Sequence, residues 1–169
     1  KQCNKNTVLE VVAYDEEKCI KGAEMAVECK CDILMGTKFY DSVNEICQKN
    51  KIKYMPFVGD VEGRPSILKG EIDEMIGEAQ QCLEKNVYGF DLLGYRYTGN
   101  QLELIRKFVS QVDAPVCIAG NINSFDKLNQ LINIEPWAFT IGGAFFDNKF
   151  EGSFEEQINK VCMYLNQER

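Results

Sequence analysis

Short apolar runs alternate along this chain with longer segments in which apolar residues recur every three or four positions. The runs predict strands at 8–13, 32–36, 53–58, 89–94, 115–119 and 137–142, with helices between and after them. Alternation of strands and helices is typical of a parallel sheet whose crossovers are helical. The pattern therefore predicts an α/β fold of six βα units, forming one domain over residues 1–169.

Two of the predicted helices show a clear apolar face. The stripe in 71–85 consists of Ile72, Met75, Ile76, Ala79, Cys82 and Leu83, and the stripe in 153–166 consists of Phe154, Ile158, Val161, Cys162 and Leu165. Ser42, Thr98 and Ser153 are each followed three residues later by Glu or Gln, which predicts a capping box at the start of three helices.

The last two predicted strands both end in small residues. The stretch "APVCIAGNINSF" (114–125) contains Gly120 and Asn121, and "AFTIGGAFFDNKF" (138–150) contains Gly142 and Gly143. In phosphate-binding barrels the loops after strands seven and eight hold the phosphate with backbone amides and a short helix, which we expect here near Ala144. An open doubly wound sheet also fits the order of elements, and one glycine per tight turn also explains part of this composition. The paired strand ends favour a parallel (β/α) TIM-type barrel with six units visible.

The phrases "PVCIAGNI" and "WAFTIGGAFF" resemble the ribulose-phosphate-binding barrel superfamily over residues 113–147. Within that group "GFDLLGYRYTG" (89–99) is similar to the sixth-strand region of the N-acetylmannosamine-6-phosphate epimerases, over residues 87–100. The resemblance implies that 8–13 is the third strand of a barrel, so that two βα units are absent from a whole of about 225 residues. Those epimerases are expected to carry an acidic residue where this chain has Asn121. A glycerol-responsive antiterminator family shares the barrel and supplies a non-enzymatic alternative.

Charge and composition exclude several classes of protein. A net charge of −7 with scattered basic residues predicts no nucleic acid partner. No apolar run reaches the roughly 18 residues of a membrane span. The eight cysteines come without histidine and without a Cys-x-x-Cys pair, which predicts reduced thiols in a cytoplasmic protein, with neither metal nor disulfide. We expect no cofactor.

Catalytic groups of a barrel lie at the carboxyl ends of its strands. Lys38, Asp60, Asp91 and Arg96 occupy such positions in this chain. Asp60 or Asp91 would serve as the base, Lys38 or Arg96 would polarise a carbonyl, and Lys38 would alternatively form the Schiff base of an aldolase. Asp91 lies in an apolar strand and needs a partner, for which Arg96 and Lys38 are the candidates.

Four further residues have structural interpretations. Asp15 caps the helix that starts at Glu16, Trp137 packs at the end opposite the chemistry, and Tyr95 and Tyr97 either stack on a sugar or pack at the rim. The long segment 59–71 separates a strand from its helix, and its residues Arg64, Ser66 and Lys69 form a candidate lid.

These observations favour a sugar-phosphate isomerase or epimerase that transfers a proton next to a carbonyl. Gly120, Asn121, Gly142 and Gly143 would bind the phosphate. The alternatives are a regulatory barrel that senses a phosphorylated ligand and a Schiff-base aldolase. Absent strands would leave an apolar sheet edge, so we expect homo-oligomers or aggregation unless another segment or partner chain fills the gap.

Overall fold

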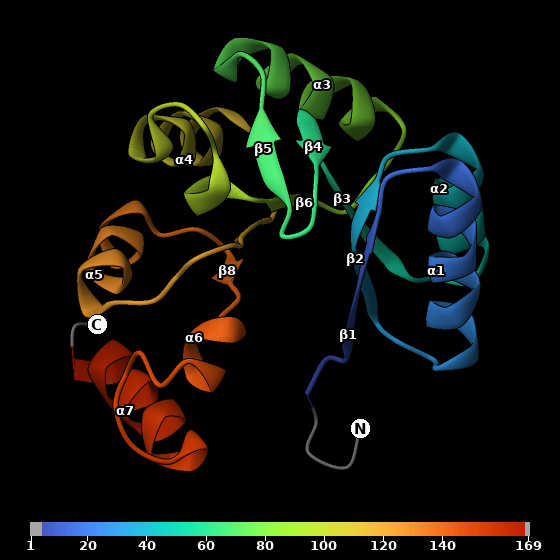
Figure 1. Cartoon of the computed structure of the whole chain (residues 1–169). Coiled ribbons are helices and arrows are strands. Elements are labelled where there is room, and N and C mark those ends of the chain that lie inside the picture. Colours follow the sequence, from blue (N-terminus) through green and yellow to red (C-terminus); the bar gives the residue numbers. More distant parts are fainter. Residues whose placement is uncertain (1–4, 168–169) are drawn as a thin grey trace.

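The computed structural model describes residues 5–167 as a curled parallel sheet with helices on its outer side (Figure 1). Six strands pair in the order β1-β2-β3-β6-β7-β8, and every pair is parallel. They are β1 (Val8–Ala13), β2 (Ile33–Lys38), β3 (Lys53–Phe57), β6 (Phe90–Leu92), β7 (Val116–Ile118) and β8 (Ala138–Phe139). The six predicted strands are thus present in sequence order, most of them shorter than expected. β1 and β8 are the two edges of this sheet.

The helices follow the strands as the alternating pattern predicts. They are α1 (Glu16–Glu28), α2 (Asp41–Lys49), α3 (Ile72–Glu84), η1 (Gly94–Arg96), α4 (Gln101–Gln111), α5 (Phe125–Ile134), α6 (Gly143–Phe146) and α7 (Phe154–Gln167). The short helix expected near Ala144 is α6.

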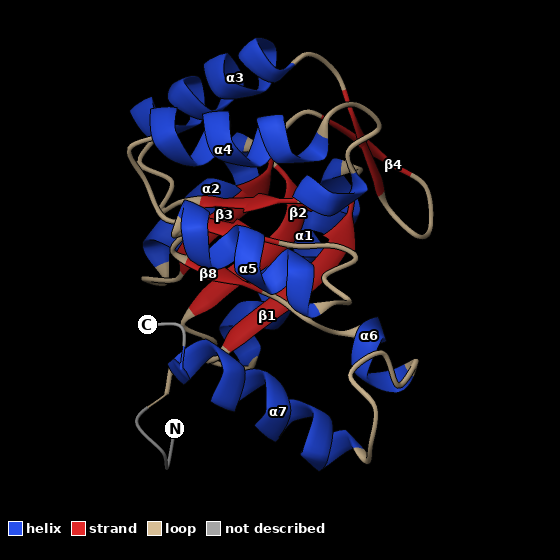
Figure 2. Cartoon of the chain, turned by 90° about the vertical axis from the view of Figure 1, so that its left-hand side faces the viewer, coloured by secondary structure: helices blue, strands red, loops and turns tan. Residues whose placement is uncertain are grey.

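The segment 59–71 forms an antiparallel hairpin that the sequence analysis did not predict. Its strands are β4 (Asp60–Glu62) and β5 (Ile67–Lys69). We had expected every pair of adjacent strands to be parallel, and this separate two-stranded sheet is the exception. Figure 2 shows the hairpin and α6 projecting on the same side of the main sheet, which is the side of the strands' carboxyl ends.

Two apolar clusters lie on opposite faces of the sheet. The larger cluster contains residues of the sheet and of the helices, so it is the layer between them. The smaller one consists of Ile33, Met35, Met55 and Cys117, all from strands. These four residues therefore lie on the concave inner face of the sheet. Residues that pair with them in register on neighbouring strands face the same side.

The predicted helix faces are confirmed in α3 and corrected in α7. Met75, Ile76, Ala79 and Cys82 are buried beneath α3. In α7 the fully buried residues are Gln157 and Val161, whereas Phe154 and Cys162 are exposed. The buried Gln157 amide donates to the Phe145 carbonyl at 3.0 Å, and its oxygen accepts from the Phe150 amide, which is why a polar residue occupies this face.

One of the three capping boxes is present. The Ser153 amide donates to Glu156, and the Glu156 amide donates to the Ser153 hydroxyl at 3.3 Å. Ser42 instead lies inside α2, and Asn100 rather than Thr98 caps α4, because its side chain accepts from the Glu103 amide.

Several of the cysteines are buried in the core. Cys19, Cys47, Cys82 and Cys117 are buried free thiols, while Cys3 lies outside the described residues. No group of three or more potential metal ligands occurs within residues 5–167. None of the described helices has both the length and the apolarity to cross a membrane.

Candidate functional site

A cavity of about 320 Å³ lies where the carboxyl ends of β7 and β8 meet. The four residues predicted to bind phosphate, namely Gly120, Asn121, Gly142 and Gly143, all line it. The structure therefore brings the two small-residue strand ends together around one space. The predicted site residues Arg96 and Ser66 also line this cavity, as do Glu10, Thr140 and Lys149.

The glycines of this cavity have different reasons to be glycine. Gly120 has a φ of +85°, and a Cβ placed on it would lie 2.7 Å from Cγ of Arg96. Its lack of a side chain thus makes room for Arg96. A Cβ on Gly142 or Gly143 would meet no protein atom within 4 Å. Packing does not explain these two glycines, whereas close approach of a ligand to the backbone would.

Arg96 follows β6 and extends across Gly120 into the cavity. Its Nη1 donates to the Ser66 carbonyl at 3.3 Å, which ties the guanidinium to the hairpin. Its Nε is buried and has no hydrogen-bond partner among the described residues. A buried donor without an acceptor is unfavourable, so Nε is a position where a ligand oxygen would be stabilised.

Glu10 is a cavity residue that the sequence analysis did not single out. It pairs in register with Met35 and so faces the concave side, where its side chain stays accessible to solvent. Partial desolvation raises the pKa of its carboxyl group, and the charge of Arg96 opposes that shift. The available signal was a single charged residue in the apolar run "VLEVVA", the same signal that identified Asp91.

Asp91 is fully buried on β6, in register with Cys117 of the inner face. Neither of its oxygens has a hydrogen-bond partner among the described residues. The expectation that Arg96 or Lys38 pairs with it is therefore wrong. Burial raises the pKa of this carboxyl group well above its usual value, and the nearby charge of Glu10 raises it further.

Lys38 and Asp60 lie together, apart from the cavity. The Lys38 ammonium is 3.7 Å from the Asp60 carboxylate. It also acts on Glu78 of α3, where its charge opposes the rise in pKa that burial causes. Neither Lys38 nor Asp60 lines the cavity. Asp15 caps α1 by accepting from the Lys18 amide at 3.0 Å, as expected.

The hairpin of the candidate lid is fastened to the end of β1. The Arg64 guanidinium donates to the Val12 carbonyl at 3.1 Å, and the Tyr14 hydroxyl donates to the Gly63 carbonyl at 2.8 Å. Tyr14 also bonds the Ser66 hydroxyl at 2.6 Å. Lys69 pairs with Glu62 within the hairpin and does not line the cavity. Of the three lid candidates, Ser66 reaches the cavity, Arg64 anchors the hairpin and Lys69 does neither.

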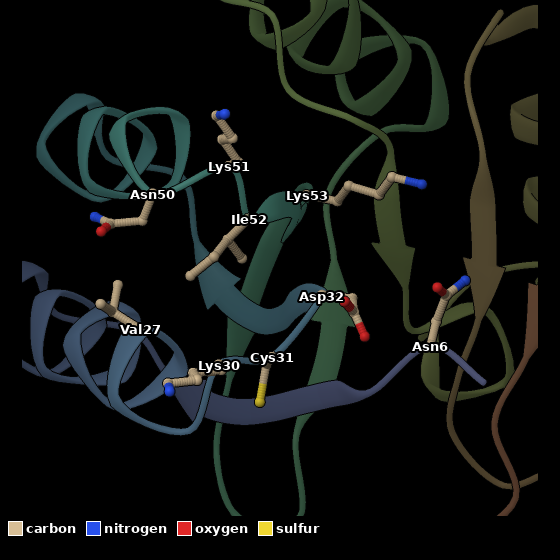
Figure 3. Close-up of a pocket in the computed structure, with 9 residues that line it drawn as sticks. All are labelled: Asn6, Val27, Lys30, Cys31, Asp32, Asn50, Lys51, Ile52 and Lys53. Atoms are coloured by element: carbon tan, nitrogen blue, oxygen red, sulfur yellow. The ribbon is translucent and has the colours of Figure 1, made fainter. Parts of the chain in front are cut away.

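A different cavity lies at the amino ends of β2 and β3, beneath the ends of α1 and α2 (Figure 3). Lys30, Lys51 and Lys53 line it, and Figure 3 shows their ammonium groups pointing away from one another. Nearby, Trp137 is half exposed and its ring contacts Tyr88 edge-on, as expected for packing at this end. Because these charges do not converge, we place the candidate site at the carboxyl ends of the strands.

Solved structures resemble this chain in fold. The native KDPGal structure matches with a TM-score of 0.60 and 11% identity, over 87% of this chain and 63% of that one. The Amycolatopsis orientalis BexX/CysO complex matches with a TM-score of 0.61 and 13% identity, over 90% and 62%. Dihydrodipicolinate synthase from Aquifex aeolicus matches with a TM-score of 0.53 and 12% identity, over 78% and 51%. The chain thus spans between half and two thirds of each of these proteins.

The fold and the cavity together define a class of protein. The sheet is of the TIM-barrel type, with six parallel strands curled into part of a barrel, and its candidate site lies at the strands' carboxyl ends. No protein family model and no curated protein matches the sequence, so the comparisons support the barrel fold and leave the ribulose-phosphate-binding superfamily as a resemblance.

Proposed function

We propose that this protein binds a small phosphorylated carbonyl compound in the cavity at the ends of β7 and β8, and that it transfers a proton next to the carbonyl, as an isomerase or epimerase does. The observation that carries the proposal is the joint lining of this cavity by Gly142, Gly143, Arg96 and Glu10. Backbone amides and a guanidinium suit a phosphate, and a carboxylate suits a base.

The geometry supports Glu10 as the general base in preference to Asp60. Glu10 lines the cavity, whereas Asp60 is an exposed residue paired with Lys38 outside it. A raised pKa brings a carboxylate closer to the proton affinity that carbon-acid chemistry requires. Arg96 would polarise the carbonyl, since its Nε is a donor without a partner among the described residues.

A carbon–carbon lyase is the second candidate. The similar structures include a dihydrodipicolinate synthase and an N-acetylneuraminate lyase, the latter at a TM-score of 0.50 and 13% identity. A Schiff-base mechanism needs a lysine that reaches the ligand, and Lys149 lines the cavity whereas Lys38 does not. If Lys149 forms a Schiff base, borohydride reduction in the presence of pyruvate should leave a covalent adduct that increases the mass of the peptide containing Lys149. Proton transfer by Glu10 forms no covalent bond, so it would leave the mass of that peptide unchanged.

Substitution of Gly142 tests the phosphate site. Gly142→Leu should lower the affinity for inorganic phosphate and for glycerol 3-phosphate at least tenfold, because a side chain would occupy space near the backbone amides. Its thermal unfolding should change little, since no protein atom lies within 4 Å of the added Cβ. Gly77→Leu on α3 is the matched control, because its Cβ also meets nothing within 4 Å and Gly77 does not line the cavity. Equal phosphate binding by parent and Gly142→Leu would contradict the proposed site.

Deuterium exchange tests the reaction itself. The parent protein, incubated with a panel of sugar phosphates in heavy water, should incorporate deuterium next to a carbonyl, and Glu10→Gln should abolish the signal in proton NMR. Phosphate binding without exchange would favour the ligand-sensing barrel.

A further inference from the structure

We propose that the ligand of this site has two parts, with its phosphate and its reacting carbonyl in the cavity at β7 and β8, which Glu10 lines, and a hydroxylated ring in a second cavity beneath the hairpin. The proposal rests on the proposed function, because it takes the first cavity to be the phosphate site. The second cavity has a volume of about 250 Å³ and is formed by the hairpin, η1 and the start of α4. Ser66, Arg96 and Asn121 line both cavities, so the two spaces adjoin.

The side chain of Arg96 lines both cavities. Its hydrogen bond to the Ser66 carbonyl holds it against the hairpin. Its buried Nε remains without a hydrogen-bond partner among the described residues. An oxygen of a ligand that spans both cavities, placed beside this atom, would accept a hydrogen bond from it, which removes the penalty of an unsatisfied buried donor.

The walls of the second cavity suit a sugar ring. Ile67 and the ring of Tyr97 provide apolar and aromatic surface, and Ile67 is among the exposed large apolar residues of the described chain. The Tyr97 hydroxyl donates to the Gly70 carbonyl at 2.8 Å, which fixes the ring in place. The Gln101 amide nitrogen is occupied by the Tyr95 and Tyr97 carbonyls, so its oxygen remains available to accept from a hydroxyl group. The C–H face of a sugar packs against such an aromatic ring while its hydroxyls bond to polar groups at the edge.

Tyr95, the other aromatic residue flanking Arg96, has a structural role. It is buried, and its hydroxyl donates to Gln130 at 2.9 Å, so its polar end is already satisfied within the protein. Stacking on a ring therefore falls to Tyr97.

Calorimetric titration with sugar phosphates of different size tests the second cavity. The parent protein should bind glucose 6-phosphate or ribose 5-phosphate at least tenfold more tightly than glycerol 3-phosphate, which has a phosphate but no ring. The double variant Ile67→Ala/Tyr97→Ala should lose this preference and keep its affinity for glycerol 3-phosphate within twofold. Tyr97→Phe keeps the ring and should keep the preference, which separates stacking from the bond to Gly70. Circular dichroism melts of each variant verify folding.

The possible failures are distinguishable. If the parent binds glycerol 3-phosphate as tightly as the two ring compounds, or if the double variant retains the preference, the second cavity is not a ring subsite and the phosphate site stands. If none of the three compounds binds, the proposed function and the ring subsite are both overturned.

Discussion

Asp91 places a carboxyl group inside the sheet, where the described residues offer it no hydrogen bond. A buried carboxylate without a partner is strongly unfavourable, so the group takes a proton instead of a counterion. Glu10 lies on the same concave face, and its negative charge raises the pKa of Asp91 further. The environment of Asp91 on the concave face therefore favours a neutral carboxyl group, and no ion pair forms there among the described residues.

Replacing Asp91 with Asn should change how stability depends on pH. Because the pKa of Asp91 is raised in the folded state, the folded protein binds more protons than the unfolded chain, and stability falls as pH rises above the unfolded value of about 3.9. Asp91→Asn removes this loss, so its stability relative to the parent should increase with pH, by up to about 1.4 kcal/mol per pH unit. Urea unfolding between pH 4 and pH 8 measures the difference. Asp113→Asn, on an exposed loop, is the control, and parallel curves for the parent and Asp91→Asn would contradict a protonated Asp91.

At the scale of the element, the starts of α2 and α7 show that one sequence motif can form different hydrogen bonds. Ser42 and Ser153 carry the same sequence signal, yet only Ser153 forms the reciprocal bonds of a capping box. Ser42 lies one residue inside α2, where its hydroxyl donates to Glu16 on the neighbouring α1. Ser42 therefore contributes an exposed contact between the two helices and does not cap α2.

This difference predicts unequal effects of the same substitution. Ser153→Ala should lower the free energy of unfolding by about 1 kcal/mol, because the Glu156 amide loses the hydroxyl oxygen that accepts its hydrogen bond. Ser42→Ala should change it by less than about 0.5 kcal/mol, since only an exposed side-chain contact is lost. Urea unfolding of both variants measures this, and equal losses would show that the bonds at Ser153 do not stabilise α7.

The whole molecule is a curled sheet whose edge strands β1 and β8 each pair on one side only among the described residues. The KDPGal and BexX/CysO structures extend well beyond the part that this chain matches. We propose that polypeptide equivalent to two βα units completes the barrel between these edges, since a closed barrel of this type has eight strands. Without it, the edges are templates for pairing with another chain.

Self-association of the 169-residue chain is the expected consequence. Light scattering should show dimers or larger species, and Val8→Lys should shift them toward the monomer. Val8 is half exposed on the edge strand β1, so a lysine there should oppose strand pairing without disturbing the core. A monodisperse monomer of the parent chain would contradict this prediction.

The sequence by itself determined the order of the elements, the parallel pairing and the two small-residue strand ends, because hydrophobic periodicity and glycine placement are local properties. The sequence also predicted that Asp91 lies in an apolar strand and that α3 buries one apolar face, because both depend on the local pattern of apolar residues. The hairpin at 59–71 was not predicted, since its short strands are held to Val12 and Arg96, which are distant in sequence. Tertiary structure alone decided which candidates share a space. It brought Glu10 and Arg96 to the glycines of β7 and β8 and left Lys38 and Asp60 outside, because the curvature of the sheet determines which strand ends face one another.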